Sequence, residues 1–124
     1  MDKKKVLLVD DEKPVLRALE RVLAAKPDCD MDITCLSDSS KVEGLLDAGQ
    51  EFDLLITDLR MTPLNGLEVI DIVQKKQPNT KVVVVSAYLN DDALHEIQQR
   101  VCSAYVRKPF KMDEVFRAVD TAIG

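Results

Sequence analysis

The sequence contains no long apolar run, no excess of basic residues and no glycine-rich segment after its first apolar stretch. Without a run long enough to cross a bilayer, we expect no contact with a membrane. The start, Met1-Asp2-Lys3-Lys4-Lys5, leads into a predicted strand and does not resemble a signal peptide. The net charge of -5, from 17 basic and 22 acidic residues, argues against direct nucleic-acid binding, which requires a cationic face.

Cysteine is also scarce. Cys29, Cys35 and Cys102 are odd in number and lack the spacing of metal ligands. We interpret them as reduced thiols that pack as small hydrophobic side chains, which is typical of a cytoplasmic protein.

What the sequence does contain fits a globular domain. Of its 124 residues, 46% are hydrophobic and 31% are charged. This length is sufficient to bury a hydrophobic core. Since no repeat, linker or low-complexity tract interrupts the chain, we expect residues 1–124 to form a single domain.

Short apolar runs alternate with helical patterns along the whole chain. The runs predict strands at 6–9, 31–36, 53–57, 82–85 and 104–107. The helical patterns cover about 14–26, 42–48, 67–77, 91–101 and 112–122. Asn90 is expected to cap the fourth helix, whose apolar stripe of Leu94, Ile97 and Val101 is sparse. The alternation predicts a doubly wound α/β fold with a five-stranded parallel sheet and right-handed crossovers.

Polar residues follow most of the predicted strands. They are Asp10 and Asp11 after the first strand, Asp58 after the third, Ser86 after the fourth and Lys108 after the fifth. The carboxyl ends of parallel strands lie at one edge of a sheet, where ligands collect. Asp58 by itself is also compatible with a turn or a helix cap. The group as a whole indicates a functional site.

The residue types in this group suit phosphoryl chemistry. Clustered carboxylates repel one another unless a cation offsets them, and oxygen ligands suit Mg²⁺. Such a metal can clamp a phosphoryl group during its transfer to an aspartate oxygen. The Lys108 ammonium and the Ser86 hydroxyl can bind other phosphoryl oxygens.

These motifs, in this order, resemble the response-regulator receiver domains of two-component signalling over the whole chain. The matching segments are Val6-Leu7-Leu8-Val9-Asp10-Asp11, Leu55-Ile56-Thr57-Asp58 with Met61 and Asn65-Gly66, Val85-Ser86-Ala87, and Tyr105 with Lys108-Pro109-Phe110. The resemblance implies the flavodoxin-like strand order 2-1-3-4-5, with helices on both faces of the sheet. It also implies a regulatory phosphoacceptor that assists its own phosphotransfer and dephosphorylation, and not a classical enzyme.

The resemblance assigns roles to individual residues. Asp58 would be the phosphoacceptor, assisted by Ser86 and Lys108. Mg²⁺ would be held by Asp10, Asp11, Asp58 and the main-chain carbonyl of Arg60. The Lys108–Pro109 bond would be cis.

The resemblance also implies partners and an output. A sensor histidine kinase would donate the phosphoryl group, and the sole histidine, His95, is not the donor. Phosphorylation would move Ser86 and turn Tyr105 inward, which switches the surface of the fourth helix, fifth strand and fifth helix. That surface would contact a downstream effector or form a homodimer.

Two positions beside the acceptor vary within the family and are bulky here. We hypothesise that Arg60 and Tyr88 hinder the approach of the hydrolytic water and prolong the phosphorylated state. The chain departs from the family in having Thr62 where proline is usual, with Pro63 one place later, and Ser86 where threonine is more frequent.

Three other functions are compatible with parts of this pattern. A haloacid-dehalogenase-type phosphatase requires a second aspartate two residues after the nucleophile, where this chain has Arg60. A nucleotide or FMN carrier is disfavoured because Asp10-Asp11-Glu12 would repel phosphate. A receiver-fold module that binds proteins without phosphorylation is the remaining alternative.

Overall fold

The computed structural model describes residues 3–124 and contains one parallel sheet. Its strands are β1 (Lys4–Val9), β2 (Met31–Leu36), β3 (Leu54–Thr57), β4 (Lys81–Ser86) and β5 (Ala104–Arg107). They lie in the order β2-β1-β3-β4-β5, and every neighbouring pair is parallel. This confirms the predicted flavodoxin-like order.

The strand sequences explain which strands lie inside the sheet. All four residues of β3 are buried, and in β4 only the first residue is exposed, so both strands require cover on both faces. Uninterrupted apolar runs are typical of such central positions in a parallel sheet. Of the outer strands, β2 is mostly half-buried and β5 has two exposed residues, and both carry more polar residues.

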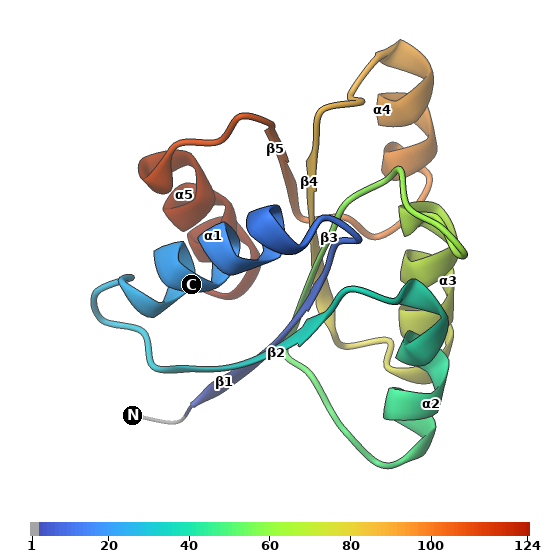
Figure 1. The fold of residues 1–124 in the computed structure, drawn as a ribbon, viewed down its shortest axis with the longest axis horizontal. Helices are drawn as coiled ribbons and strands as arrows, with labels where there is room; N and C mark the ends of the chain where they lie inside the picture. The colour runs from blue at the N-terminus through green and yellow to red at the C-terminus, as the bar shows by residue number, and fades with distance from the viewer. Residues whose placement is uncertain (1–2) are drawn as a thin grey trace.

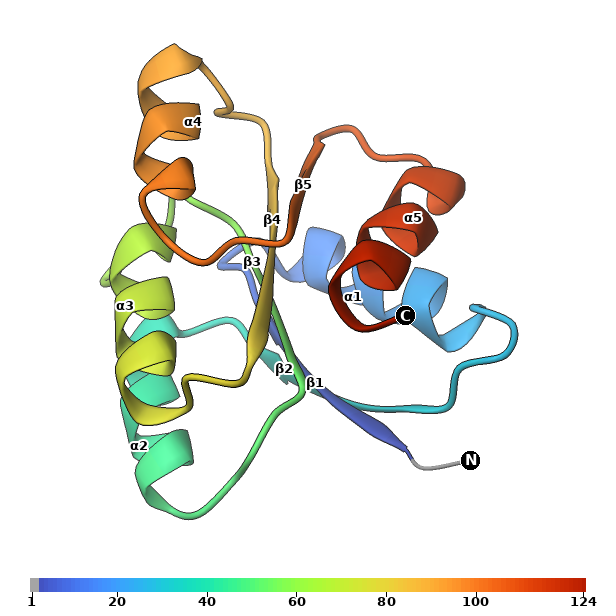
Figure 2. The ribbon, with the colours of Figure 1, turned by 180° about the vertical axis from the view of Figure 1, so that it is seen from behind.

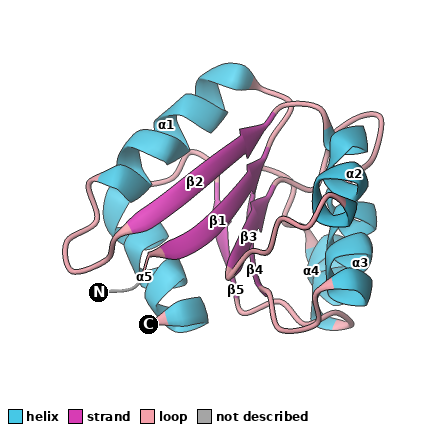
Figure 3. Ribbon diagram, turned by 90° about the horizontal axis from the view of Figure 1, so that it is seen from below, coloured by secondary structure: helices cyan, strands magenta, loops and turns pink. Residues whose placement is uncertain are grey.

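Helices cover both faces of the sheet. They are α1 (Lys13–Ala24), α2 (Val42–Asp47), α3 (Gly66–Lys76), α4 (Asp91–Gln98) and α5 (Met112–Ile123), with a short 3₁₀ helix, η1 (Ser39–Lys41), before α2. Figures 1 and 2 show α1 and α5 on one face and α2, α3 and α4 on the other. Figure 3 shows the same layers in a view turned by 90°. Alternate side chains of the strands therefore enter two separate apolar clusters, one under each helical layer.

The predicted fourth helix was too long. Asn90 caps α4 as expected, since its side chain accepts a hydrogen bond of 2.8 Å from the amide of Ala93. The helix ends at Gln98, however, and Val101 is 65% exposed in the following loop. Only Ile97 of α4 is fully buried. The chain leaves the helix early because the Ser103 amide pairs with the carbonyl of Val82, 2.8 Å away, as the chain joins the sheet.

The three cysteines are free thiols, each half-buried. Within residues 3–124, no helix has both the length and the apolar character needed to span a bilayer.

Candidate functional site

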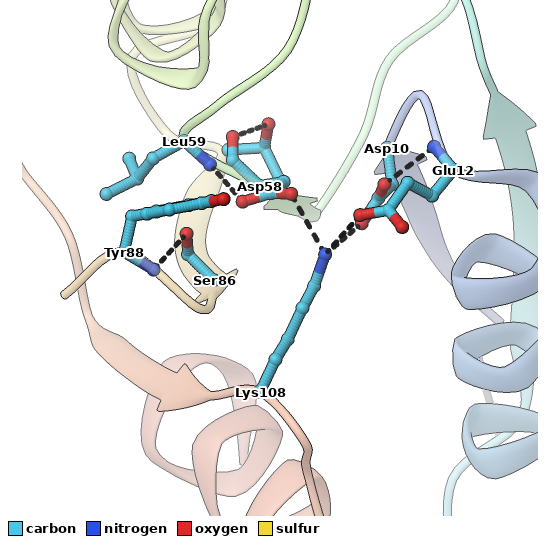
Figure 4. A network of polar contacts seen from close by, with 8 residues as sticks. Asp10, Glu12, Asp58, Leu59, Ser86, Tyr88 and Lys108 are labelled. Atoms are coloured by element: carbon cyan, nitrogen blue, oxygen red, sulfur yellow. Dashed lines mark hydrogen bonds and ion pairs between the residues drawn. The ribbon is translucent and has the colours of Figure 1, made fainter.

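Four of the five polar residues predicted at the strand ends lie together at one edge of the sheet, and Asp11 is exposed. Asp10 follows β1, Asp58 follows β3 and Ser86 closes β4, while Lys108 reaches over from the end of β5 (Figure 4). Asp10, Asp58 and Ser86 are buried, with 1%, 4% and 0% of their surfaces exposed. The register of the parallel strands thus brings residues far apart in the sequence to one edge of the sheet.

Lys108 is the cation at the centre of this group. Its Nζ lies 2.8 Å from Asp10 Oδ2 and 2.9 Å from Asp58 Oδ2, and it lies 3.8 Å from Glu12 Oε1. One ammonium therefore bridges two buried carboxylates. Leaving a buried carboxylate without its cation would be strongly destabilising.

Burial and charge shift the pKa values in opposite directions at this site. Burial raises the pKa of Asp10, the hydrogen bonds from Lys108 and from the Glu12 amide lower it, and the net shift is upward. The charge of Asp58 adds to the rise. For Lys108, burial favours a lower pKa, but the hydrogen bonds to Asp10 and Asp58 outweigh it and raise the pKa above its usual value. The lysine is therefore held in its charged form.

The acidic residues also fit a divalent cation. Asp10, Glu12 and Asp58 each place a carboxylate oxygen within 4.8 Å of the others. A set of ligands made only of oxygen suits Mg²⁺. Glu12 was not predicted. The Glu12 amide donates to Asp10 Oδ1 over 2.9 Å, and this turn brings its side chain toward the site, while Asp11 is exposed and lines an adjoining cavity.

Two main-chain contacts hold the region of Asp58 in place. The amide of Leu59 donates to Asp58 Oδ1 over 2.6 Å, and the Thr57 hydroxyl donates to the Asp58 carbonyl over 2.9 Å. Together with the bond from Lys108, these contacts orient both oxygens of the carboxylate. A carboxylate held in this way can act as a nucleophile.

Gly66, the first residue of α3, packs directly against Asp58. A Cβ on Gly66 would overlap the carbonyl oxygen of Asp58 and would lie 2.8 Å from Leu59 Cα. The Gly66 amide donates to the Leu59 carbonyl over 2.8 Å. Asn65 and Glu68 form a capping box at the same point, with bonds of 2.9 Å and 3.1 Å. A side chain at position 66 would therefore displace Asp58 or the helix.

Arg60 and Tyr88, from the loops that follow β3 and β4, contact each other. The Arg60 guanidinium lies 4.1 Å from the centre of the Tyr88 ring. Both residues line a cavity of about 540 Å³ between the loops that follow β3 and β4. The amide of Tyr88 donates to Ser86 Oγ over 3.1 Å, and Figure 4 shows both residues beside Asp58 on the side away from Asp10.

Tyr105 lies outside this cluster. It is 48% exposed on β5.

The Lys108–Pro109 bond is cis, and so is the Thr62–Pro63 bond in the loop after β3. The sequence therefore located the cluster itself, whereas Glu12 had no signal of its own beyond its place in an acidic run.

Residues 6–120 match the family described as the response regulator receiver domain. The chain is similar to the DNA-binding transcriptional regulator NtrC of Salmonella typhimurium, with 29% identity over 119 residues, which is 96% of this chain and 24% of that protein. It is 32% identical to the transcriptional regulatory protein GlrR of Escherichia coli over 120 residues, which is 95% of this chain and 26% of that protein. The chain thus spans about a quarter of the length of these relatives.

Solved structures show the same fold at lower identity. The signal receiver domain of an HD domain-containing protein from Pseudomonas fluorescens Pf-5 has a TM-score of 0.84 and 20% identity, covering 98% of this chain and 95% of that one. A receiver domain protein from Clostridium thermocellum has a TM-score of 0.82 and 23% identity, covering 97% and 94%. The sequence match, the fold and the cluster of acidic residues with Lys108 agree, and the chain belongs to the response regulator receiver domain family.

Proposed function

We propose that this domain accepts a phosphoryl group on Asp58 from a histidine kinase and passes the signal to its α4–β5–α5 surface. As a receiver domain, the chain is a regulatory phosphoacceptor rather than a classical enzyme. The observation that carries the proposal is the buried Asp58 carboxylate, oriented at the end of β3 with the Lys108 ammonium 2.9 Å away and further carboxylates beside it.

The transfer requires one bond to form and one to break. An oxygen of the Asp58 carboxylate attacks phosphorus, and the bond from phosphorus to the donor is broken. With phosphohistidine the leaving atom is a ring nitrogen, and with an acyl phosphate it is the carboxylate oxygen. Lys108 neutralises charge on the phosphoryl oxygens, and the buried Ser86 hydroxyl can donate a hydrogen bond to one of them.

The site also fits the cofactor expected of such chemistry. Asp10, Asp58, the acidic residues Asp11 and Glu12, and the main-chain carbonyl of Arg60 would hold Mg²⁺. When bound, Mg²⁺ supplies positive charge and orientation to the transferring phosphoryl group. Burial raises the pKa of Asp10 and the Asp58 charge adds to the rise, so a bound cation would favour the charged carboxylates.

The output would use the elements around β5. A phosphoryl group adds charge and acceptor oxygens beside Ser86, whose hydroxyl would move toward it. Tyr105, now 48% exposed, would turn inward behind it. α4 suits a mobile part of this surface, because only one of its residues is fully buried. An effector domain or protein, or a second copy of the chain, would read the change.

Arg60 and Tyr88 would set the lifetime of the phosphorylated form. Their stacked side chains stand beside the acceptor at the cavity through which water would approach. We infer that they slow the attack of water on the phosphorylated Asp58.

The assignment of Asp58 is tested with acetyl phosphate and Mg²⁺. Intact mass spectrometry should show one added phosphoryl group, which hydroxylamine removes. Asp58→Asn should abolish the addition, because an amide is a poor nucleophile. Asp32→Asn, at an exposed position of β2, is the matched control and should be labelled like the wild type. A wild-type domain that neither acetyl phosphate nor a histidine kinase modifies would favour the alternative, a receiver that binds proteins without phosphorylation.

A further inference from the structure

A buried serine, Ser39, holds the loop that follows Asp58. Ser39 begins η1, between β2 and α2, and only 1% of its surface is exposed. Its Oγ donates to the carbonyl of Leu64 over 2.8 Å and accepts from the amide of Leu64 over 2.9 Å. A single hydroxyl therefore satisfies both main-chain groups of one loop residue.

That loop, residues 59–65, builds one wall of the functional site. It begins with Leu59, whose amide bonds to Asp58, and Leu59, Arg60, Met61, Thr62 and Asn65 line the cavity beside the acceptor. At its other end, the Gly66 amide bonds to the Leu59 carbonyl. The bond from Gly66 to Leu59 thus joins the two ends of the loop, and Ser39 holds Leu64 near the second end.

The short helix η1, which carries Ser39, is itself held in place. Asp38 caps η1, because its side chain accepts bonds from the Ser40 amide at 3.0 Å and the Ser40 hydroxyl at 2.6 Å. Val42, which follows η1, is fully buried in the core under α2 and α3. Leu64 also packs against this core. A shift of the loop would therefore have to break the two bonds to Ser39.

We propose that Ser39 is a positioning residue that fixes the 59–65 loop so that the Arg60 main-chain carbonyl is available to Mg²⁺. This inference rests on the proposed function of the site, since it concerns how the chain binds the cation used there. Without the hydroxyl, the half-buried amide and carbonyl of Leu64 would need other partners, and the loop would move to find them. Substitution of a residue that orients a metal ligand typically lowers the metal affinity by about tenfold or more.

The test compares two variants that each lose one buried hydroxyl. Ser39→Ala removes the grip on Leu64. Thr80→Val is the matched control, because Thr80 is 3% exposed and its hydroxyl donates to the Phe52 carbonyl over 2.6 Å, at the amino-terminal end of β4 and away from the site. Mg²⁺ binding is followed by amide NMR shifts, with no phosphodonor present. We expect Ser39→Ala to bind Mg²⁺ about tenfold more weakly, with altered amide shifts in 59–65, and Thr80→Val to bind like the wild type.

The acetyl phosphate reaction gives a second readout. Ser39→Ala should need a higher Mg²⁺ concentration for half-maximal labelling and should approach the wild-type rate at saturating Mg²⁺, because Asp58 and Lys108 are intact. Equal Mg²⁺ affinity in Ser39→Ala and wild type, or an equal loss in Thr80→Val, would overturn the proposal.

Hydrogen exchange of the unmodified chain tests the hydrogen bonds between Ser39 and Leu64 without any substitution. The Leu64 amide should exchange slowly because Ser39 Oγ holds it, and free exchange there would contradict the proposal even if Ser39→Ala did not fold. A wild type that binds Mg²⁺ yet is never phosphorylated would refute the proposed function and leave the role of Ser39 in metal binding intact.

Discussion

Asp58 has a partner at each carboxylate oxygen, the Leu59 amide at one and the Lys108 ammonium at the other. Each oxygen of an ionised carboxylate has two lone pairs, so these bonds orient the group without consuming its capacity to react. Lys108 also shields Asp58 from the neighbouring charge of Asp10. The same contacts that make burial of the carboxylates tolerable therefore orient Asp58 for the attack on phosphorus that we propose.

The lifetime of the phosphorylated form is predicted to depend on Arg60 and Tyr88. If the stacked pair obstructs the hydrolytic water, Arg60→Ala and Tyr88→Ala should each lose phosphate faster than the wild type. The two effects should not add fully in the double variant, because each side chain holds the other in place across 4.1 Å. Phosphate release after removal of the phosphodonor measures the rate. Unchanged or slower release in both single variants would show that the pair does not hinder water.

The half-buried thiol of Cys35 is predicted to react slowly with alkylating agents below strongly alkaline pH. Burial raises its pKa to about 11, and the nearby charge of Glu20 adds to the rise. Since the thiolate is the reactive form, the rate of reaction with iodoacetamide should rise about tenfold per pH unit and level off only near pH 11. Peptide mass spectrometry of the alkylated chain measures this.

The same shift predicts the effect of Cys35 on stability. Its pKa in the folded chain lies above the ordinary value of 9.0, so its stabilising contribution is complete below pH 9 and is lost as the pH rises toward 11. Glu20→Gln should lower the pKa only in part, because burial is the larger cause. Equal alkylation profiles for the native chain and the urea-unfolded chain would contradict the assignment.

At the scale of elements, the junction of β3 with α3 is predicted to tolerate no side chain at position 66. Gly66→Ala would force the added methyl group against the Asp58 carbonyl and Leu59 Cα, both main-chain atoms that cannot move independently. We expect a loss of about 1–3 kcal/mol in the free energy of unfolding, together with slower labelling by acetyl phosphate. Urea denaturation and mass spectrometry measure the two effects.

Gly44 provides the matched control for this substitution. It lies inside α2, and a Cβ there would meet nothing within 4 Å. Gly44→Ala should therefore raise the stability by roughly 0.5–1 kcal/mol, because alanine favours helix over glycine. Its labelling rate should remain that of the wild type. If both alanine variants behaved alike, the close approach of α3 to the acceptor would not be the cause.

The elements that could be predicted from sequence are those with a strong period or an uninterrupted apolar run. The all-aliphatic run in β4 suits a buried position inside a parallel sheet, so its inner place could be predicted, whereas the strand order came from the family resemblance. Val101 was misplaced because helical spacing continues through it, although Ser103 must already pair with β4. Spacing alone does not record where a chain has to rejoin its sheet.

The residues of the site were predicted only where they follow a strand. The carboxyl ends of parallel strands lie at one edge of the sheet, which is why Asp10, Asp58 and Lys108 could be predicted to lie together. The inward turn of Glu12 and the grip of Ser39 on Leu64 depend on loop geometry, which has no period in the sequence. Only the folded chain shows them.

At the scale of the whole molecule, β4 and β5 connect the acceptor to the outer surface. Ser86 ends β4 inside the site, and Tyr105 pairs with Val84 on the adjacent strand while its side chain faces solvent. A movement at Ser86 can therefore reach Tyr105 through two neighbouring strands. α4 follows β4 on the same face of the sheet as α3 in Figures 1 and 2, and Ile97 is its one fully buried residue, so it has less buried surface than the other helices to resist displacement.

We predict that phosphorylation of Asp58 reduces the exposure of Tyr105. The chain has two tyrosines, so incorporation of 3-fluorotyrosine should give two ¹⁹F signals, which Tyr88→Phe and Tyr105→Phe would assign. The solvent isotope shift of the Tyr105 signal should shrink after treatment with acetyl phosphate and Mg²⁺, because its side chain, now 48% exposed, turns toward the interior. Asp58→Asn, treated identically, should show no change, since it cannot carry the phosphoryl group. A Tyr105 that stays equally exposed in a fully phosphorylated chain would mean that the signal leaves the site by another route, and the surface of α4 and α5 would then lose its link to the acceptor.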